Sequence, residues 1–213
     1  MTRPELFPSD AILDAALAVV AESGVGALTM TAVARRLGAP SGSLYHRFSS
    51  RAELAGRLWL RTQDRFHEVF AAGLEHPDPL TAARHAARNV VEFSHDQRLD
   101  AMLAMRYRAD DLLRAQWPDD VMVLYRRQRR RMSSTITSLQ RAFGLDDRES
   151  LRRITFAVID VPYSAVRAAI VSVRLPDALV KQLIDEAVVA LLEPLVVARR
   201  ASAIERAEEL DQQ

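Results

Sequence analysis

Cysteine is absent from this sequence, and lysine is nearly absent, because Lys181 is the only lysine among 29 basic residues. Without cysteine the chain forms no disulfide, has no thiolate nucleophile and cannot hold a metal through sulfur. We attribute the scarcity of lysine to genome composition. The histidines have no metal-ligand spacing on one helix face, so we expect no metal site (His67, His76, His85 and His95).

Long apolar runs and enzyme motifs are missing as well. The first residues lack the apolar core of a secretory signal, and the most apolar late stretch is interrupted by Glu193 and Pro194. We therefore expect a cytoplasmic protein with no membrane partner. The sequence has no phosphate-binding glycine-rich loop, no Gly-x-Ser-x-Gly and no His-Glu-x-x-His, so we expect neither an enzyme nor a cofactor.

The spacing of apolar residues predicts an all-α protein. Apolar residues recur three and four apart nearly everywhere between glycines and prolines, and no segment alternates convincingly with period two. The 213 residues, 49% of them hydrophobic, suffice for one small and one larger domain. We expect a three-helix domain at 1–55, a larger helical-bundle domain at 56–205 and a frayed tail at 206–213.

Helix start and stop signals are clear near the amino terminus. Ser9 is a candidate N-cap for a first helix that stops at Gly24, and a short second helix follows Thr31. A capping-box pattern at 50–53 begins a long helix that continues to about Leu74 and so enters the larger domain. Further helices are expected at about 80–95, 98–105, 121–143, 148–173 and 177–199.

The second helix and a third, at about 41–48, have the anatomy of a helix-turn-helix. Their apolar residues would pack against one another, with Gly42 allowing close approach of the helices (Val33, Ala34, Leu37, Leu44 and Phe48). Small polar, aromatic and basic side chains would remain outside, where they suit phosphates and base edges (Ser41, Ser43, Tyr45, His46 and Arg47).

The charge of this region also points to DNA. Between Thr29 and Arg61 there are six arginines and a single acid, Glu53, a local excess of +5 (Arg35, Arg36, Arg47, Arg51, Arg57 and Arg61). Neutralising DNA phosphates releases counterions and supplies much of the affinity of such proteins. The expected partner of this segment is therefore a polyanion, although the whole chain has a formal net charge of only +1.

The segment 28–58 resembles the DNA-binding end of the TetR family of regulators. The residues that carry the resemblance are Thr31, Ala34, Gly38, Ser41-Gly42-Ser43, Leu44-Tyr45, His46, Phe48, Ser50-Arg51 and Leu54. Pro40 stands where the family often has a serine, and Arg51 replaces the commoner lysine. The resemblance implies a homodimer that binds a palindromic operator in double-stranded DNA, usually as a repressor that a small molecule releases.

The resemblance also implies roles for single residues. Thr31, Tyr45 and Arg51 would contact phosphates, and Ser41, Ser43 and His46 would approach bases. The position of Arg47 on the same helix adds it to this set. Alternatively, Tyr45 packs against its neighbours and His46 is an ordinary polar surface residue.

The last two predicted helices are apolar over most of their circumference. Such helices must bury a second side, which a second copy of the chain would cover in a four-helix interface. The alternative is one large core within a monomer. In the resembling family the last two helices form the dimer interface, and the residues expected there are Leu151, Val166, Ile170, Leu183, Val188, Leu191 and Leu195.

Asp160 is the most unusual residue of the larger domain, because it lies between two apolar residues just before Pro162. A buried carboxylate needs a partner, and the proline leaves the carbonyl of Val158 without its helical N–H. The partner would be an internal arginine, a group of the second chain or a ligand. A pocket for a largely apolar effector would combine Met102, Met105, Trp117, Tyr125, Asp160 and Tyr163, unless these residues are plain core.

Other interpretations remain at this point. The arginine-rich run at 126–131 is either a solvated helix face or a second nucleic-acid patch. The whole chain could instead be an all-helical enzyme with an incidental helix-turn-helix-like end, or a protein-interaction bundle. Salt-dependent binding to duplex DNA would favour the regulator, and catalytic turnover would favour the enzyme.

Overall fold

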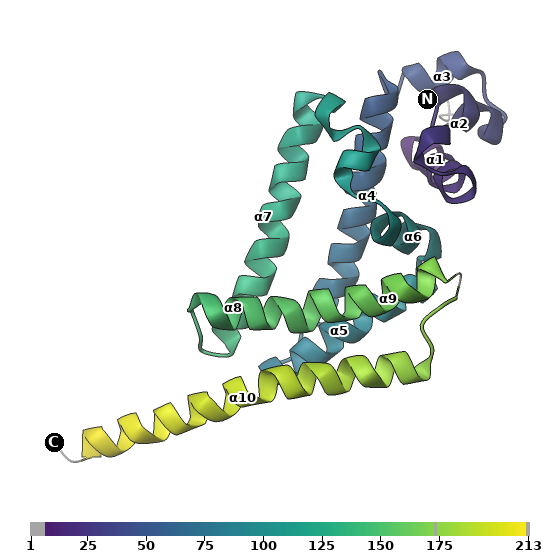
Figure 1. The fold of residues 1–213 in the computed structure, drawn as a ribbon. Helices are drawn as coiled ribbons and strands as arrows, with labels where there is room; N and C mark the ends of the chain where they lie inside the picture. The colour runs from purple at the N-terminus through teal and green to yellow at the C-terminus, as the bar shows by residue number, and fades with distance from the viewer. Residues whose placement is uncertain (1–6, 173, 212–213) are drawn as a thin grey trace, which may run out of the picture. The chain divides into compact units, whose positions relative to one another are not determined.

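The computed structural model describes residues 7–172 and 174–211, and for residues 198–211 it describes the backbone alone. No strand occurs in these ranges, which confirms the predicted all-α fold. Figure 1 shows the helices along the chain. The α-helices are α1 (Ser9–Ser23), α2 (Met30–Leu37), α3 (Ser41–Tyr45), α4 (Arg51–Ala72), α5 (Pro79–Asp96), α6 (Arg98–Arg106), α7 (Asp119–Ala142), α8 (Arg148–Thr155), α9 (Val161–Val171) and α10 (Ala178–Asp211). Shorter elements are the 3₁₀ helices η1 (Val25–Ala27), η2 (Ala109–Leu112) and η3 (Arg114–Gln116), and the π-helical η4 (Phe156–Asp160).

The chain forms two compact units. One comprises residues 1–65 and 97–129, and the other comprises residues 66–96 and 130–213. Both α4 and α7 run from one unit into the other, so neither unit is a continuous segment. The predicted boundary between a DNA-binding domain and a ligand-binding domain, after residue 55, divides the chain by function and not by compactness. It stays a prediction. The backbone of α10 continues to Asp211, and residues 212–213 lie outside the described range. The frayed tail expected at 206–213 stays a prediction.

Side-chain caps set the starts of α2 and α4. The hydroxyl of Thr29 accepts a hydrogen bond from the N–H of Ala32 at 3.1 Å, so α2 begins just before the predicted start. At α4, the hydroxyl of Ser50 accepts from the N–H of Glu53 at 3.1 Å. The Glu53 carboxylate in turn accepts from the N–H and the hydroxyl of Ser49, both at 2.8 Å. The predicted capping box is thus present, but its return bond reaches one residue further back.

The start of α1 corrects a prediction. Ser9 is already helical, and the cap position belongs to Pro8, whose side chain makes no cap bond. Proline fits this position because its fixed φ and missing N–H cost little where no helical partner exists.

The first unit has one apolar core, built by α1 to α4 with α6 and the start of α7. Gly56 of α4 allows the closest approach, because a Cβ there would lie 2.6 Å from Val121 Cγ1 and 3.0 Å from the Trp117 ring. The indole N–H of Trp117 donates to the carbonyl of Leu112 at 2.7 Å, so this large side chain is buried without an unpaired donor. The core fixes α2 and α3 against α1 and α4.

The second unit packs α5 against α10 and against α9. Gly73 brings the end of α4 onto α5, since a Cβ there would lie 2.5 Å from Ala86 Cα. Arg84 of α5 holds both carboxylate oxygens of Asp185 on α10, at 2.9 and 2.7 Å. Such a two-bond pair fixes direction as well as distance.

The long helix predicted at 148–173 is interrupted by the π-helical turn η4. Pro162 has no N–H, so the carbonyl of Val158 lacks its usual helical donor. The N–H of Val161 binds the carbonyl of Phe156, five residues back, which is the spacing of a π-helix. The stretch Arg148–Val171 is long and apolar enough to cross a membrane by length and composition, a property that it shares with core helices of soluble proteins.

Candidate nucleic-acid interface

The helix pair α2–α3 has the predicted apolar packing. Val33, Ala34, Leu44 and Phe48 are buried, and Leu37 is half-buried. Gly38 ends α2 in the left-handed region, with φ 65°, which turns the chain toward α3. Figure 1 shows α1, α2 and α3 gathered in one small cluster.

Most of the residues predicted to contact DNA lie on the surface of this pair. Thr31, Ser41, His46 and Arg47 are exposed, and the Tyr45 side chain is 54% exposed. A tyrosine that leaves half of its area in water on a five-residue helix contributes little to the core, so the packing alternative for Tyr45 is not favoured. The face combines a phenol, an imidazole and a guanidinium.

Ser43 and Arg51 are partly engaged inside the protein. The Ser43 hydroxyl is half-buried and donates to the carbonyl of Pro40 at 2.6 Å. The Arg51 guanidinium donates to the carbonyls of Val25 and Gly26 at 3.3 and 3.4 Å. Arg51 therefore holds η1 against the start of α4, and its contact with phosphate stays a prediction.

The role expected for Gly42 is wrong. Gly42 is exposed, and a Cβ built on it would meet no atom of another helix within 4 Å. No helix approaches this glycine, so it is not there to bring α2 and α3 together.

The local excess of +5 overstates the positive charge of this region, because acids from elsewhere in the chain pair with its arginines. Arg36 binds Glu22 of α1 at 2.5 Å, and Arg57 binds Asp120 of α7. Both acids lie outside the segment in which the charge was counted. Only the fold could show these pairings.

Sequence reasoning missed a charged network that joins α1, α4 and α6. Arg61 binds Asp14 of α1 at 2.8 Å, and Arg65 binds Asp100 of α6 at 2.8 Å. The hydroxyl of Thr62 also donates to Asp100, which is 4% exposed. Burial, and then the neighbouring charge of Arg65, lower the pKa of Arg61. The sequence offered one signal for this network: Arg61, Thr62 and Arg65 lie on one side of the predicted long helix.

The residues predicted to bind an effector fall into both units. Met105 and Trp117 are buried and Met102 and Tyr125 are half-buried in the first unit, where the rings of Trp117 and Tyr125 meet edge to face at 5.5 Å. Tyr163 is half-buried in the second unit. Whether these residues contact an effector stays a prediction.

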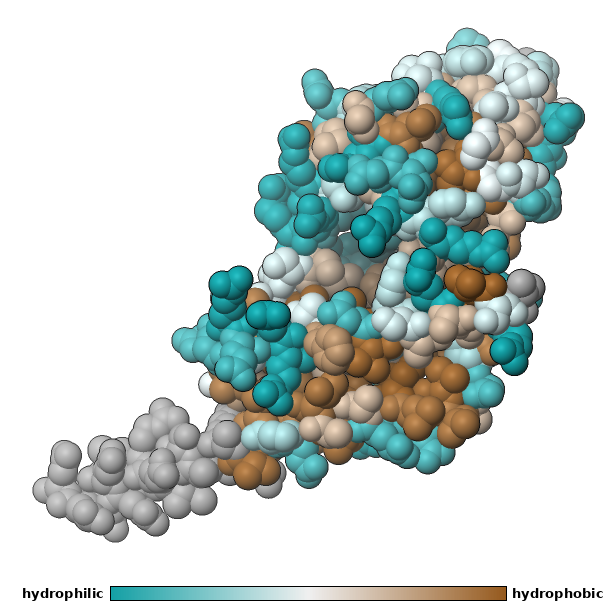
Figure 2. All heavy atoms as spheres, in the orientation of Figure 1, coloured by the Kyte–Doolittle hydropathy of each residue, from teal (hydrophilic) through white to brown (hydrophobic). Residues whose placement is uncertain are grey.

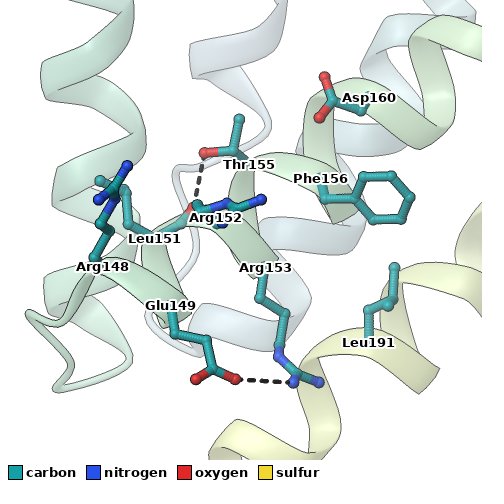
Figure 3. Close-up of a pocket in the computed structure, with 9 residues that line it drawn as sticks. All are labelled: Arg148, Glu149, Leu151, Arg152, Arg153, Thr155, Phe156, Asp160 and Leu191. Atoms are coloured by element: carbon teal, nitrogen blue, oxygen red, sulfur yellow. Dashed lines mark hydrogen bonds and ion pairs between the residues drawn. The ribbon is translucent and has the colours of Figure 1, made fainter.

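The expected burial of Asp160 is wrong. Asp160 is exposed at the end of η4 and needs no internal partner. It lines an open-sided pocket of about 1020 Å³ (Figure 3). The remaining lining residues come from α8, η4 and α10 and are Arg148, Glu149, Leu151, Arg152, Arg153, Thr155, Phe156 and Leu191. The lining of the pocket thus combines three arginines with the apolar side chains of Leu151, Phe156 and Leu191.

The predicted dimer residues divide into two groups. Val166, Ile170 and Val188 are buried within the second unit of the single chain, and their part in a dimer interface stays a prediction. Leu183 is 53% exposed, and Leu151, Leu191 and Leu195 are half-buried. Exposed apolar side chains of this unit that the prediction missed are Phe156, Val171, Leu179 and Val197. Figure 2 shows apolar residues gathered over α9 and α10.

The chain is similar to known transcriptional regulators. The family described as bacterial regulatory proteins, tetR family, matches residues 12–58. No curated protein matches the chain.

Solved structures share the fold over most of their length. A transcriptional regulator from Rhodococcus sp. Rha1 has a TM-score of 0.66 and 17% identity, over 87% of this chain and 96% of that one. A TetR-family regulator from Streptomyces coelicolor has a TM-score of 0.57 and 20% identity, over 88% and 98%. The regulator FadR from Bacillus subtilis, in complex with stearoyl-CoA, has a TM-score of 0.62 and 16% identity, over 86% and 97%.

Proposed function

We propose that this protein is a homodimeric repressor that a small molecule releases from a palindromic operator. The proposal is supported by the match of residues 12–58 to the tetR family of bacterial regulatory proteins and by the similarity of the fold to TetR-like transcriptional regulators. The observation that carries the DNA-binding part is the exposed face of α3. Tyr45, at the end of α3, and His46 and Arg47, in the turn that follows, are exposed, whereas Leu44 of the same helix is fully buried. A short helix held in this way suits the major groove.

Dimerisation is supported by the apolar surface of the second unit. Phe156, Val171, Leu179 and Leu183 are each more than half exposed in the single chain. Four large apolar side chains on neighbouring helices of one unit are unfavourable in water, and a second copy would cover them. A two-fold pair also presents two α3 helices, which suits an operator whose half-sites are related by the same symmetry.

Release by a ligand is supported by the composition of the first unit. It contains α6 together with α1, α2 and α3, and the Asp14–Arg61 and Arg65–Asp100 ion pairs tie α1 and α6 to α4. A ligand that shifts α6 would therefore displace the helices that hold the reading face. The bound stearoyl-CoA of the Bacillus subtilis FadR structure makes a largely apolar effector a reasonable first candidate here.

Selection from a library of random duplex DNA tests the DNA-binding part. We expect the wild type to enrich a pseudo-palindrome whose half-site centres lie about 34–36 Å apart or a multiple of this. Enrichment of a single asymmetric site bound by one chain would contradict the dimeric arrangement. No enrichment at all would contradict the proposed function.

Linkage tests the ligand part. Long-chain fatty acids and acyl-CoA thioesters are titrated against the selected duplex bound to the protein. An effector that weakens duplex binding must bind less tightly, by the same factor, when the duplex is present. Compounds that bind equally well with and without the duplex do not release it, and a panel of only such compounds would contradict release by this class of molecule.

The enzyme alternative has less support. The match at 12–58 is to regulatory proteins, and the similar solved structures named above are transcriptional regulators.

A further inference from the structure

The pocket of about 1020 Å³ in the second unit carries more positive than negative charge. Three arginines and two acids line it, namely Arg148, Arg152, Arg153, Glu149 and Asp160. Glu149 binds Arg153 at 3.5 Å. Arg148 and Arg152 have no ion-pair partner in the part of the chain that the structure describes. Two guanidinium groups at this pocket are therefore unpaired.

Asp160 lies too far along the helix to neutralise these two arginines. It is twelve residues from Arg148 and eight from Arg152, which corresponds to about 18 Å and about 12 Å along a helix axis. Figure 3 shows Arg148 and Asp160 at opposite ends of the pocket. One end of the pocket therefore stays positively charged.

The two unpaired arginines do not stabilise α8. Arg148 and Arg152 are four residues apart, so they lie on the same side of the helix, where like charges repel. Arg148 is also the first residue of α8, where the partial positive charge of the helix end disfavours a cation. An anion bound between the two guanidinium groups would offset both effects.

An apolar surface completes the pocket. Phe156, the first residue of the π-helical η4, is 51% exposed, and Leu191 of α10 is half-buried. Figure 3 shows these two side chains, from different helices, on the same side of the pocket. The hydroxyl of Thr155 donates to the carbonyl of Leu151 at 2.8 Å, so it is not free to donate to a ligand. Cations and apolar side chains are thus what the pocket offers, next to a π-helical turn of the kind that is frequent at functional sites.

We propose that this pocket binds an organic anion with an apolar body. Its carboxylate, phosphate or sulfonate group would accept hydrogen bonds from Arg148 and Arg152, because guanidinium groups match the geometry of oxyanions. Its apolar part would cover Phe156 and Leu191. The volume of about 1020 Å³ lies at the upper end of the range of about 300–1,000 Å³ that is typical of small-molecule sites. This site is separate from most of the predicted effector residues, which lie in the first unit, and it does not depend on the proposed DNA binding.

Two fluorescent probes that differ in charge test the proposal. Anilinonaphthalene sulfonate is an aromatic anion, and phenylnaphthylamine has the same rings without the sulfonate. Both are titrated against the full chain. We expect Arg148→Gln and Arg152→Gln each to weaken binding of the sulfonate by roughly threefold to tenfold, because one charge-assisted hydrogen bond is lost in a pocket open to water. Binding of the neutral probe should not change.

Two further variants separate charge from apolar contact. Arg174→Gln is the matched control, because Arg174 is exposed in the second unit, lies outside the pocket lining and has no ion-pair partner within the described ranges. It should bind both probes as the wild type does. Phe156→Ala should weaken the binding of both probes and leave the circular dichroism spectrum unchanged, since half of the Phe156 side chain is in water.

The competing occupant is a second copy of the chain, because Phe156 also belongs to the proposed dimer face. If the second copy filled the pocket, Arg148→Gln and Arg152→Gln would bind the sulfonate as the wild type does, and this result would overturn the proposal. An equal loss in Arg174→Gln, or an equal loss of both probes in the arginine variants, would overturn it too. A chain that selects no duplex would contradict the proposed function and not this site, so the two failures are distinguishable.

Discussion

Single side chains on α3 and in the turn after it have separate roles. Leu44 is fully buried and anchors the helix, while the next three residues point into solvent. Because an exposed side chain contributes little to stability, substitutions at Tyr45, His46 and Arg47 should affect DNA binding and leave the fold intact.

Arg47→Ala should weaken binding to all duplexes alike. The substitution removes one phosphate contact from each protomer of the proposed dimer, and each lost contact lowers the slope of log affinity against log salt by about 0.9, because one fewer counterion is released. Fluorescence anisotropy over a salt series measures this slope. The control is Arg114→Ala, which removes the same charge from an exposed ion pair with Asp110 elsewhere in the first unit. An unchanged slope in Arg47→Ala would remove this residue from the interface.

Asp100 is a buried carboxylate that we expect to stabilise the first unit. Asp100→Asn keeps the shape but removes the charge that faces Arg65 and Thr62, which should cost about 1–3 kcal/mol. Urea unfolding monitored by circular dichroism measures the loss. Asp110→Asn, whose carboxylate is 68% exposed, should change stability by less than about 1 kcal/mol. Equal effects of the two substitutions would contradict a role for burial.

At the scale of helices, charged pairs fix α10 to α5. Hydrogen bonds from Arg84, and then the charge of Arg88, hold the pKa of Asp185 below its usual value, although burial opposes this shift. The same contact raises the pKa of Arg84. The two directions agree, so the pair favours the ionised carboxylate in the folded state.

This pairing predicts a pH-dependent stability. The ionised pair stabilises the fold fully above the unfolded-state pKa of about 3.9, and the stabilisation is lost as the pH falls through the lower folded-state pKa. Asp185→Asn should therefore be less stable than the wild type at neutral pH, and the difference should narrow below about pH 4. Urea unfolding at a series of pH values checks this. Glu149→Gln, at a carboxylate 84% exposed, is the control, and a constant difference for Asp185→Asn would contradict the role of the pair.

At the scale of the whole molecule, we expect the apolar face of the second unit to decide assembly. Leu183→Arg should leave a folded chain, because the side chain is 53% exposed, but should convert the dimer to monomers, since an unpaired charge in an apolar interface costs several kcal/mol. Sedimentation velocity measures the state. Val123→Arg places the same charge at a side chain 55% exposed in the first unit and should leave the dimer intact. If the Leu183→Arg variant remained dimeric, the proposed interface on this part of α10 would be contradicted.

The local features of this protein could be predicted because they depend on residues close in sequence. The cap at Ser50 and Glu53, the turn at Gly38 and the spacing of Leu44 and Phe48 are each determined within about one helical turn. These features suffice for the helix-turn-helix, for the outward position of Tyr45 and His46, and for most helix bounds within a few residues. The exception is the end of α10, which continues to Asp211 although the sequence predicted an end at about residue 199. The resemblance to the TetR family depends on the same short-range pattern.

The sequence alone could not determine which apolar and charged residues meet across the fold. Val166 and Val188 are buried while Leu183 is exposed, because neighbouring helices cover only one side of α9 and α10. Asp160 faces solvent because Pro162 forces a π-helical turn that shifts the helix face. The partners of Arg36 and Arg61 come from α1, far from them in sequence. Periodicity shows that a helix has an apolar side, but only tertiary packing decides which part of that side is left for a partner.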